Sequence, residues 1–245
     1  MDRLIYTAMS GASHTLNQQA TVAQNLSNVN TPGYRAAVNT FRAVPLVGEG
    51  LPTRTFVVDS TAGADFTPGV MQQTGRSLDV AVQGSGWIAV QMEDGSEAYT
   101  RNGSLQLSPN GILQTRSGLN VAGDAGLISV PPDTEVTFAK DGTLSTVPSG
   151  SKPNQVVVAG RIKLVNPPEG QMVRGDDGLF RTRDGNPAEA DASVMLAPGS
   201  LEGSNVNTVE ALVNMISLAR QFDMQMKMLQ SADNNAKQAG SILSI

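Results

Sequence analysis

Apolar residues near the start of the chain recur at alternating steps of four and three. This spacing places them along one face of a helix, in the manner of a coiled-coil seam with one polar member. The pattern predicts a helix over residues 4–28, ending at the Asn30-Thr31-Pro32-Gly33 turn because proline cannot continue a helix. The seam consists of Ile5, Met9, Ala12, Leu16, Gln19, Ala23 and Leu26.

A second helical pattern covers residues 207–240. Asn207 is suited to the N-cap, and Glu210 three positions later completes a capping box. The four-three spacing lasts for about five heptads, which again predicts a coiled-coil helix. Methionines along this helix indicate adaptable packing rather than a metal or cofactor site. The seam consists of Leu212, Met215, Ala219, Phe222, Met226, Leu229, Asp233, Ala236, Gly240 and Leu243.

Between these helices, short apolar runs alternate with turn signals and no helical period intervenes, which predicts a β-rich region. We interpret Gly84-Ser85-Gly86 as a hairpin turn, and five Asn-Gly or Asp-Gly pairs mark further turns. The turn pairs are Asp94-Gly95, Asn102-Gly103, Asn110-Gly111, Asp141-Gly142 and Asp184-Gly185. The expected strands are Leu78–Gln83, Trp87–Met92, Glu97–Arg101, Ile112–Thr115, Leu127–Val130, Glu135–Ala139, Gln155–Val165 and Gly178–Thr182.

These patterns predict an α+β protein with four regions. Residues 1–35 form the N-terminal helix and turn, residues 66–200 a central all-β domain, and residues 201–245 the C-terminal helix. Residues 36–65 are expected to be an irregular or extended linker, because prolines and glycines interrupt it, although Arg54–Asp59 could be a strand. The two helices are expected to pair as a coiled-coil-like layer.

Charge is distributed unevenly along the chain. Leu4 through Tyr34 contains no Asp, Glu, Lys or Arg, so the first helix is covered by neutral polar residues that are mediocre helix formers. Such a helix depends on packing for its stability. A surface helix with neutral polar residues is the alternative. Most of the net charge of −5 falls on the middle region, which fits helices buried in an assembly and a β domain that faces water.

Composition excludes several classes of function. The chain has no cysteine, which rules out disulfides and thiolate sites. The 17 Lys and Arg residues are scattered, so we expect no nucleic-acid binding. No apolar stretch approaches the roughly 20 residues of a membrane span, and residues 1–20 lack the apolar core of a cleavable signal peptide.

We find no pattern that indicates catalysis. The one histidine, His14, has no second ligand or nucleophile partner at a useful spacing. Asp176-Asp177-Gly178 lacks the further ligands of a calcium loop, and Gly84-Ser85-Gly86 lacks the rest of a dinucleotide fingerprint. We therefore expect a structural protein that is not an enzyme and has no catalytic, cofactor-binding or metal residues and no small-molecule substrate.

Residues 23–35 (AQNLSNVNTPGYR) resemble the N-terminal motif of flagellar rod and hook proteins, and residues 201–206 (LEGSNV) with the helix after them resemble the C-terminal motif. By these motifs and those below, nearly the whole chain resembles the flagellar basal-body rod protein family. Residues 74–87 (TGRSLDVAVQGSGW) and 99–104 (YTRNGS) resemble the core of the rod group. The opening residues 1–12 (MDRLIYTAMSGA) are most similar to the proximal rod group. The distal rod group, which has a longer insertion after the first motif, is the near alternative.

The resemblance implies a subunit of the rod, with the paired terminal helices as its inner layer and the β domain outside. Its partners would be other copies of itself, other rod proteins and the flagellar type III export apparatus. It would leave the cytoplasm without signal cleavage and assemble into the rod across the periplasm, which transmits torque and encloses the export channel. A secreted β-domain enzyme with helical tails and a soluble coiled-coil adaptor remain alternatives.

We expect the two seams and motifs to be subunit interfaces. The N-terminal interface residues are Ile5, Met9, Ala12, Leu16, Ala23, Asn25, Leu26, Asn28, Pro32, Gly33 and Tyr34. The C-terminal interface residues are Leu201, Asn205, Val206, Leu212, Met215, Ala219, Phe222, Met226 and Leu229.

Overall fold

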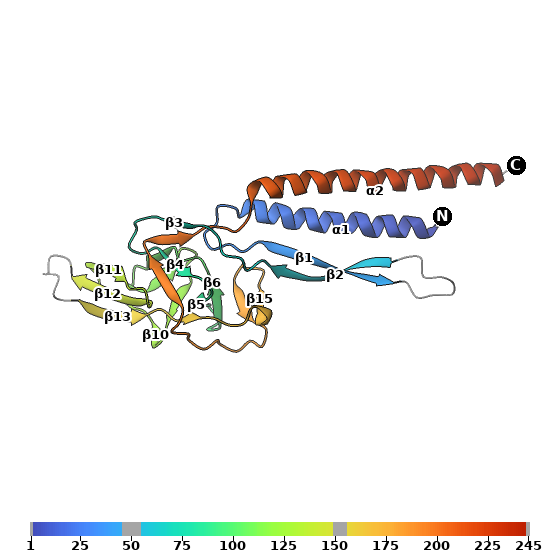
Figure 1. Ribbon diagram of the computed structural model, residues 1–245. Helices are drawn as coiled ribbons and strands as arrows, with labels where there is room; N and C mark the ends of the chain where they lie inside the picture. Colours follow the sequence, from blue (N-terminus) through green and yellow to red (C-terminus); the bar gives the residue numbers. More distant parts are fainter. Residues whose placement is uncertain (1, 46–54, 149–155, 244–245) are drawn as a thin grey trace. The chain divides into compact units, whose positions relative to one another are not determined.

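The computed structural model describes residues 2–45, 55–148 and 156–243 of the chain. The chain forms two compact units. The first contains residues 1–28, 37–65 and 206–245, and the second contains residues 29–36 and 66–205. The predicted mixture of two terminal helices and a central β region is confirmed (Figure 1).

The first unit contains the two long helices, α1 (Asp2–Ser27) and α2 (Thr208–Leu243). They lie side by side and run antiparallel, so both chain ends are at the same end of the pair (Figure 1). Asn207 caps α2 as predicted, because its Oδ1 accepts hydrogen bonds from the amides of Val209 at 3.0 Å and Glu210 at 3.3 Å.

The less exposed face of each helix keeps the four-three spacing but includes only part of the predicted seam: four of seven positions in α1, and three of the nine in α2 whose exposure is described. The other positions of this face are next to predicted ones, because in an isolated sequence with a period of 3.6 residues two adjacent four-three series fit nearly equally well. The less exposed residues are Ile5, Ala8, Ala12, Thr15, Gln19, Val22 and Leu26 in α1, and Ala211, Met215, Leu218, Phe222, Gln225, Leu229 and Ala232 in α2.

The remaining predicted seam positions differ in exposure. Ala219 is half-buried. The seam positions Asp233, Ala236 and Gly240 are exposed, and the side chain of Leu243 lies outside the described residues. The predicted interface residues of the seams that are exposed are Met9, Leu16, Ala23, Leu212 and Met226. Their expected role in contacts between subunits stays a prediction, whereas their expected place between the two helices of one chain is wrong.

A β-hairpin occupies the segment that we expected to be an irregular or extended linker. Strand β1 (Ala37–Pro45) pairs with the antiparallel strand β2 (Thr55–Ala64), which overlaps the expected strand Arg54–Asp59. Most of the prolines and glycines of this segment lie between residues 45 and 52, and residues 46–54 are outside the described residues. The sequence on either side of them is therefore free to form regular strands.

The hairpin packs against α1 through three polar or aromatic pairs. The Asn25 side chain binds the backbone of Ala37 twice, at 2.9 and 2.8 Å. The Asn39 amide donates to the Thr21 hydroxyl at 2.6 Å. The rings of His14 and Phe41 meet edge to face at 5.8 Å. Neutral polar residues of α1 are thus used inside the chain, which accounts for part of its uncharged surface.

The second unit is built from short antiparallel strands. Its largest sheet has nine strands, seven of them in the order β15-β16-β6-β5-β9-β8-β7, with β10 on β9 and β14 on β5. The smaller sheets are β11-β12-β13, β17-β4 and β18-β3. A 3₁₀ turn, η1, covers Glu169–Gln171. The strands are β3 Met71–Gln73, β4 Val80–Gln83, β5 Trp87–Gln91, β6 Glu97–Thr100, β7 Leu105–Leu107, β8 Leu113–Thr115, β9 Asn120–Gly123, β10 Gly126–Leu127, β11 Thr134–Phe138, β12 Thr143–Pro148, β13 Val157–Arg161, β14 Leu164–Val165, β15 Met172–Arg174, β16 Phe180–Thr182, β17 Met195–Pro198 and β18 Ser200–Glu202.

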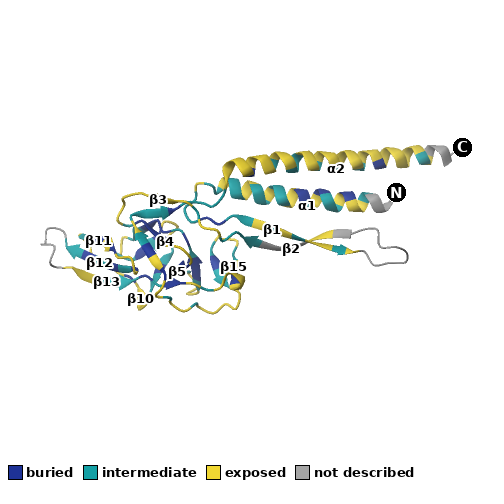
Figure 2. Ribbon diagram, viewed as in Figure 1, coloured by how far each residue is buried: buried dark blue, intermediate teal, exposed yellow. Residues whose placement is uncertain are grey.

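Buried residues gather in this second unit, whereas α2 is mostly exposed (Figure 2). A single hydrophobic cluster runs through the core and includes Val80, Ile88, Leu113, Leu144 and Leu196. This core fixes the strands on which the candidate site is built.

Most expected strands are present, with three corrections. Leu127–Val130 is a strand only at Leu127, and the expected strand Gln155–Val165 is divided into β13 and β14, with Gln155 outside the described residues. Gly84-Ser85-Gly86 is not a hairpin turn, because β4 pairs with β17 and not with β5. A turn signal marks where the chain bends but does not identify the strand that pairs afterwards.

Candidate functional site at the terminal junction

Residues from both ends of the chain meet inside the second unit. We call residues 29–36 the N-terminal segment, residues 200–205 the C-terminal segment, and their meeting place the terminal junction. The Gly33 amide donates to the carbonyl of Glu202 at 2.7 Å, and the Asn205 amide donates to the carbonyl of Tyr34 at 3.3 Å. The Ala36 amide donates to Asn205 Oδ1 at 2.7 Å. The two family motifs, far apart in sequence, are therefore joined directly.

Gly33 is required by this geometry. Its φ of 70° lies in the left-handed region, and a Cβ there would overlap the backbone of Arg101. The turn predicted at Pro32-Gly33 thus also provides the close approach between the N-terminal segment and the β domain.

Glu202 is the charged centre of the junction. Its Oε1 lies 2.7 Å from Arg35 Nη1, and its Oε2 lies 3.0 Å from Arg101 Nη1. The Gly69 amide donates to Oε1 at 2.9 Å. The side chains of Arg35 and Glu202 are each 1% exposed. Two guanidinium groups therefore share one carboxylate in a place that water does not reach.

Burying two guanidinium groups beside a single carboxylate is electrostatically unfavourable unless all three charges stay in contact. Burial lowers the pKa of Arg101 below its usual value, the carboxylate of Glu202 opposes that shift, and the charge of Arg35 adds to it. Within the described part of the chain, Arg35 Nε and Nη2 and Arg101 Nε have no hydrogen-bond partner. Removing one partner from a buried ion pair costs about 3–5 kcal/mol, so each charge here depends on the others.

Aromatic rings contact two arginines at the junction, Arg101 and Arg174. Arg101 lies over the ring of Trp87 at 5.4 Å, and Trp87 packs against Phe180 with ring centroids 4.5 Å apart. Arg174 lies 4.5 Å from the ring centroid of Tyr34. Its Nη1 also donates to the carbonyl of Arg35 at 3.1 Å. The aromatic contact of Arg101 positions one of the two charges that converge on Glu202, and Arg174 holds the N-terminal segment through Tyr34 and the Arg35 carbonyl.

Several predicted interface residues lie at the junction. Gly33, Tyr34 and Asn205 contact the opposite segment directly, and Leu201 is half-buried where β18 pairs with β3. Pro32 lies in the turn before Tyr34, and Val206 begins the return to the first unit. Their expected role between subunits stays a prediction.

Two other predicted residues have local roles in the first unit. The Asn28 side chain donates to the carbonyl of Gln24 at 2.9 Å, just beyond the end of α1. Asn25 binds the backbone of β1 as described above. These bonds satisfy polar groups within one chain.

Sequence reasoning did not select the ionic residues Arg35, Arg101, Arg174 and Glu202. The available signal was the position of Arg35 and Glu202 inside the two motifs, because a charged residue in a nearly neutral segment needs a partner. The identity of that partner depends on contacts over more than 160 positions, which a local pattern does not contain.

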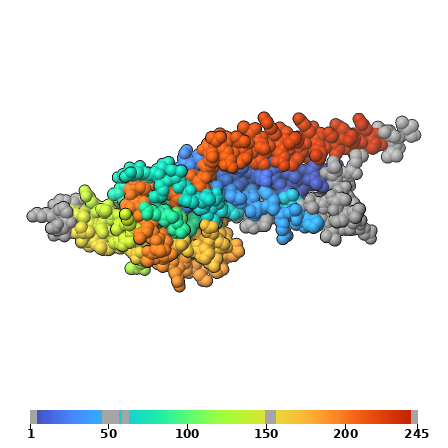
Figure 3. All heavy atoms as spheres, in the orientation of Figure 1, coloured from blue at the N-terminus to red at the C-terminus, as the bar shows by residue number. Residues whose placement is uncertain are grey.

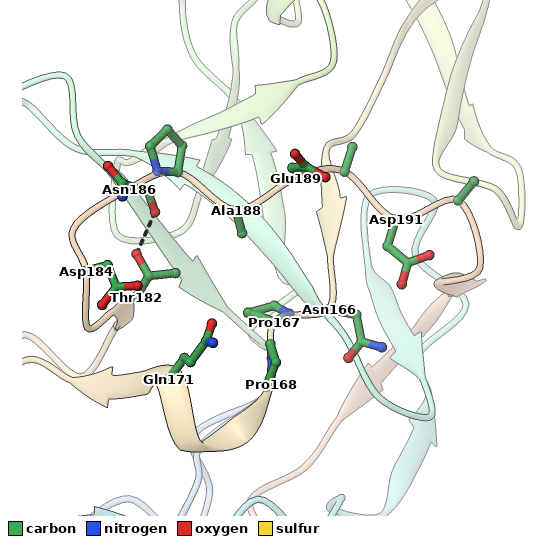
Figure 4. A pocket seen from close by; sticks show the side chains of 13 residues that line it. Asn166, Pro167, Pro168, Gln171, Thr182, Asp184, Asn186, Ala188, Glu189 and Asp191 are labelled. Atoms are coloured by element: carbon green, nitrogen blue, oxygen red, sulfur yellow. Dashed lines mark hydrogen bonds between the residues drawn. The ribbon is translucent and has the colours of Figure 1, made fainter.

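The second unit also has a pocket of about 550 Å³ (Figure 4). The Tyr99 hydroxyl accepts from the Ala188 amide at 2.7 Å, and the Thr182 hydroxyl donates to the Asn186 carbonyl at 2.6 Å, which holds one wall. The carboxylates of Asp184 and Asp191 lie on opposite sides, so they do not converge on one point (Figure 4). Among the described residues no group of three or more His, Cys, Asp or Glu side chains is placed to hold a metal ion.

Neither helix has a stretch in its described residues that is apolar enough over a sufficient length to cross a membrane.

Three family models match successive parts of the chain. Residues 5–35 match the family described as "Flagella basal body rod protein". Residues 81–146 match the "Flagellar hook protein FlgE/F/G D1 domain", and residues 197–242 match the "Flagellar basal body rod FlgEFG protein C-terminal". The first match includes residues 29–35 of the N-terminal segment, and the last includes the whole C-terminal segment of the terminal junction.

Curated relatives match the chain at full length. It is 53% identical to the flagellar basal-body rod protein FlgF of Escherichia coli (strain K12), and both chains are covered completely. It is 51% identical to FlgF of Salmonella typhimurium, again over all of both chains. It is 32% identical to the rod protein FlgG of Buchnera aphidicola from Acyrthosiphon pisum, over 86% of this chain and 88% of the relative. The chain therefore belongs to the flagellar basal-body rod protein family, as its motifs indicate, and is similar to FlgF along its whole length.

Proposed function

We propose that this chain is a structural subunit of the bacterial flagellar rod and is not an enzyme. The observation that carries the proposal, beside the full-length similarity to FlgF, is the apolar surface of the helix pair. Tyr6, Met9 and Leu16 of α1 are exposed in the single chain, as are Val209, Val213 and Ile216 of α2. The outer surface of α2 is open along its length in the isolated chain (Figure 3). Apolar side chains gathered on one surface mark a site of protein association.

In this proposal the helices form a coiled-coil-like inner layer by packing on copies of the same chain and on other rod proteins. The absence of charge from Leu4 through Tyr34 supports burial of α1 in such a layer, since no charge has to be removed from water. Many contacts of this kind would let the rod resist torque and enclose the export channel.

The proposed route and place follow from membership of the family. The chain is exported by the flagellar type III apparatus without signal cleavage and is assembled in the rod across the periplasm. The similarity to FlgF supports the proximal rod, and the similarity to FlgG keeps the distal rod as the second candidate. A secreted enzyme finds no support in the geometry of the junction, where the buried carboxylate of Glu202 is held by Arg35, Arg101 and the Gly69 amide.

Deleting the gene and examining isolated basal bodies tests the proposal. We expect basal bodies without a completed rod, restored by the wild-type gene. A chain with Leu16→Pro should fail to restore the rod while its β unit stays folded, because proline interrupts α1. Leu16→Met, which keeps both the helix and an apolar side chain at this position, is the matched control for backbone disruption. Complete rods in the deletion strain, or full rescue by Leu16→Pro, would contradict the proposal.

A further inference from the structure

The two segments of the terminal junction are held in unequal ways. The C-terminal segment contains β18, which pairs with β3 from Ser200↔Gln73 to Glu202↔Met71. The Gly203 amide then donates to the carbonyl of Val70 at 2.8 Å. This segment is therefore attached to the β domain by a strand ladder that includes no residue of the N-terminal segment.

The N-terminal segment contains no strand, and four of its residues bind the C-terminal segment. Gly33 and Arg35 bind Glu202, and Tyr34 and Ala36 bind Asn205. Other attachments include the Arg35 hydrogen bond to the Thr67 carbonyl at 2.8 Å and the contacts of Arg174 with Tyr34 and the Arg35 carbonyl. Glu202 and Asn205 thus hold four successive residues of the N-terminal segment, Gly33 to Ala36.

The ion pairs show the same inequality, because Arg35 depends on Glu202 more than Glu202 depends on Arg35. If Arg35 leaves, Glu202 still has Arg101 at 3.0 Å and the Gly69 amide at 2.9 Å, so a balanced pair remains. If Glu202 leaves, Arg35 would be buried beside a second guanidinium with no carboxylate between them. A buried charge without a counter-charge is strongly unfavourable, so Arg35 would return to water.

We propose that the terminal junction assembles in a fixed order, in which the C-terminal segment docks on the β domain first and its Glu202 then creates the binding site for Arg35 and the N-terminal segment. Because the chain is synthesised from its N-terminus, residues 29–36 remain undocked until residues 200–205 have been made and placed. This order concerns folding of the single chain and holds whether or not the proposed rod function is correct.

Hydrogen exchange of the full-length chain, read by mass spectrometry of peptides covering residues 29–36 and 200–205, tests the order. Arg35→Met should speed exchange about tenfold or more in residues 29–36 and leave residues 200–205 nearly as protected as in the wild type. Glu202→Gln should speed exchange in residues 29–36 to a similar extent, although that substitution lies in the other segment. Glu97→Gln, which breaks the Lys163 ion pair elsewhere in the β unit, is the matched control and should change neither peptide.

The proposed order requires that the two segments lose exchange protection unequally when Arg35 is replaced. If Arg35→Met lowers exchange protection equally in both segments, the proposed order is overturned. It is also overturned if the peptide covering residues 29–36 stays protected in Glu202→Gln. Peptides covering β5 report whether the β unit remains folded. If Glu202→Gln lowers protection there as well, Asn205→Ala replaces it, since Asn205 is half-buried and uncharged. Asn205→Ala should then release residues 29–36 while β5 and β18 stay protected, and unchanged exchange in residues 29–36 would overturn the proposal.

Discussion

Gly11 of α1 lies directly against the side chain of Gln225 of α2, so that a Cβ on Gly11 would come within 3.0 Å of Gln225 Nε2. Gln225 is a polar residue on the half-buried face of α2, between Phe222 and Leu229. A polar residue at one such position can set the register of a helix pair. The missing side chain at Gly11 provides the space for it.

This contact predicts that Gly11→Leu destabilises the helix pair by about 1–3 kcal/mol, because the added side chain must displace Gln225. Gln225→Ala in the same chain should recover part of that loss by freeing the space. Thermal unfolding followed by the helical circular dichroism signal measures both. If the effects of the two substitutions simply add, Gly11 and Gln225 do not act as a pair.

Substitutions of exposed apolar residues on α1 should impair rod assembly without lowering the stability of the isolated chain. Met9 and Leu16 are 54% and 48% exposed, so replacing both with Gln should change the stability of the isolated chain by less than about 0.5 kcal/mol each. The same substitutions should abolish or strongly reduce rod assembly if this surface contacts a neighbouring subunit, and swimming in soft agar measures the effect. Normal motility would remove Met9 and Leu16 from the interface.

Ala12 provides the opposite test on the buried face of the same helix. Ala12→Leu adds bulk where the residue is 7% exposed, and overpacking of this kind costs about 1–3 kcal/mol. Denaturant unfolding of the isolated chain should therefore respond to Ala12→Leu and not to changes at Met9. A large loss of stability from changes at Met9, beside the loss from Ala12→Leu, would mean that the predicted seam, which contains both residues, describes the chain better.

The helices could be predicted from sequence because their signals are local. Asn207 caps α2 through amides two and three residues away, and proline closes the N-terminal pattern. The strand β12 was missed because its buried positions, Leu144 and Thr146, alternate with Ser145 and other small polar residues, which weakens the apolar pattern. The junction was missed for another reason, since the partners of Glu202 are distant residues that only the folded β domain brings together.

A surface ion pair on the β15–β16 hairpin predicts a small acid sensitivity. A hydrogen bond from the Arg181 side chain, at 2.6 Å from Asp177 Oδ2, lowers the pKa of Asp177 below its usual value. A lowered folded-state pKa adds stability above the unfolded pKa that is lost as the pH falls through the folded value. Both side chains are about a third exposed, so the contribution is a few tenths of a kcal/mol. Asp177→Asn should flatten the fall in thermal midpoint between about pH 5 and pH 2 slightly, and an unchanged profile would show that the pair contributes nothing.

Comparing two glycines with nearly the same φ distinguishes the cost of backbone strain from the cost of a steric overlap at the junction. Gly33 has a φ of 70° and Gly75 a φ of 73°, but a Cβ on Gly75 meets nothing within 4 Å, whereas one on Gly33 would overlap Arg101. Gly75→Ala should cost only the backbone strain, about 1–2 kcal/mol. Gly33→Ala should cost more, because the N-terminal segment must also move away from Arg101 and lose its bond to the Glu202 carbonyl. Denaturant unfolding followed by Trp87 fluorescence measures the first cost, and hydrogen exchange in residues 29–36 measures the second. Equal exchange in the two variants would mean that the N-terminal segment tolerates a side chain at Gly33, and the close packing at the junction would then have no energetic consequence.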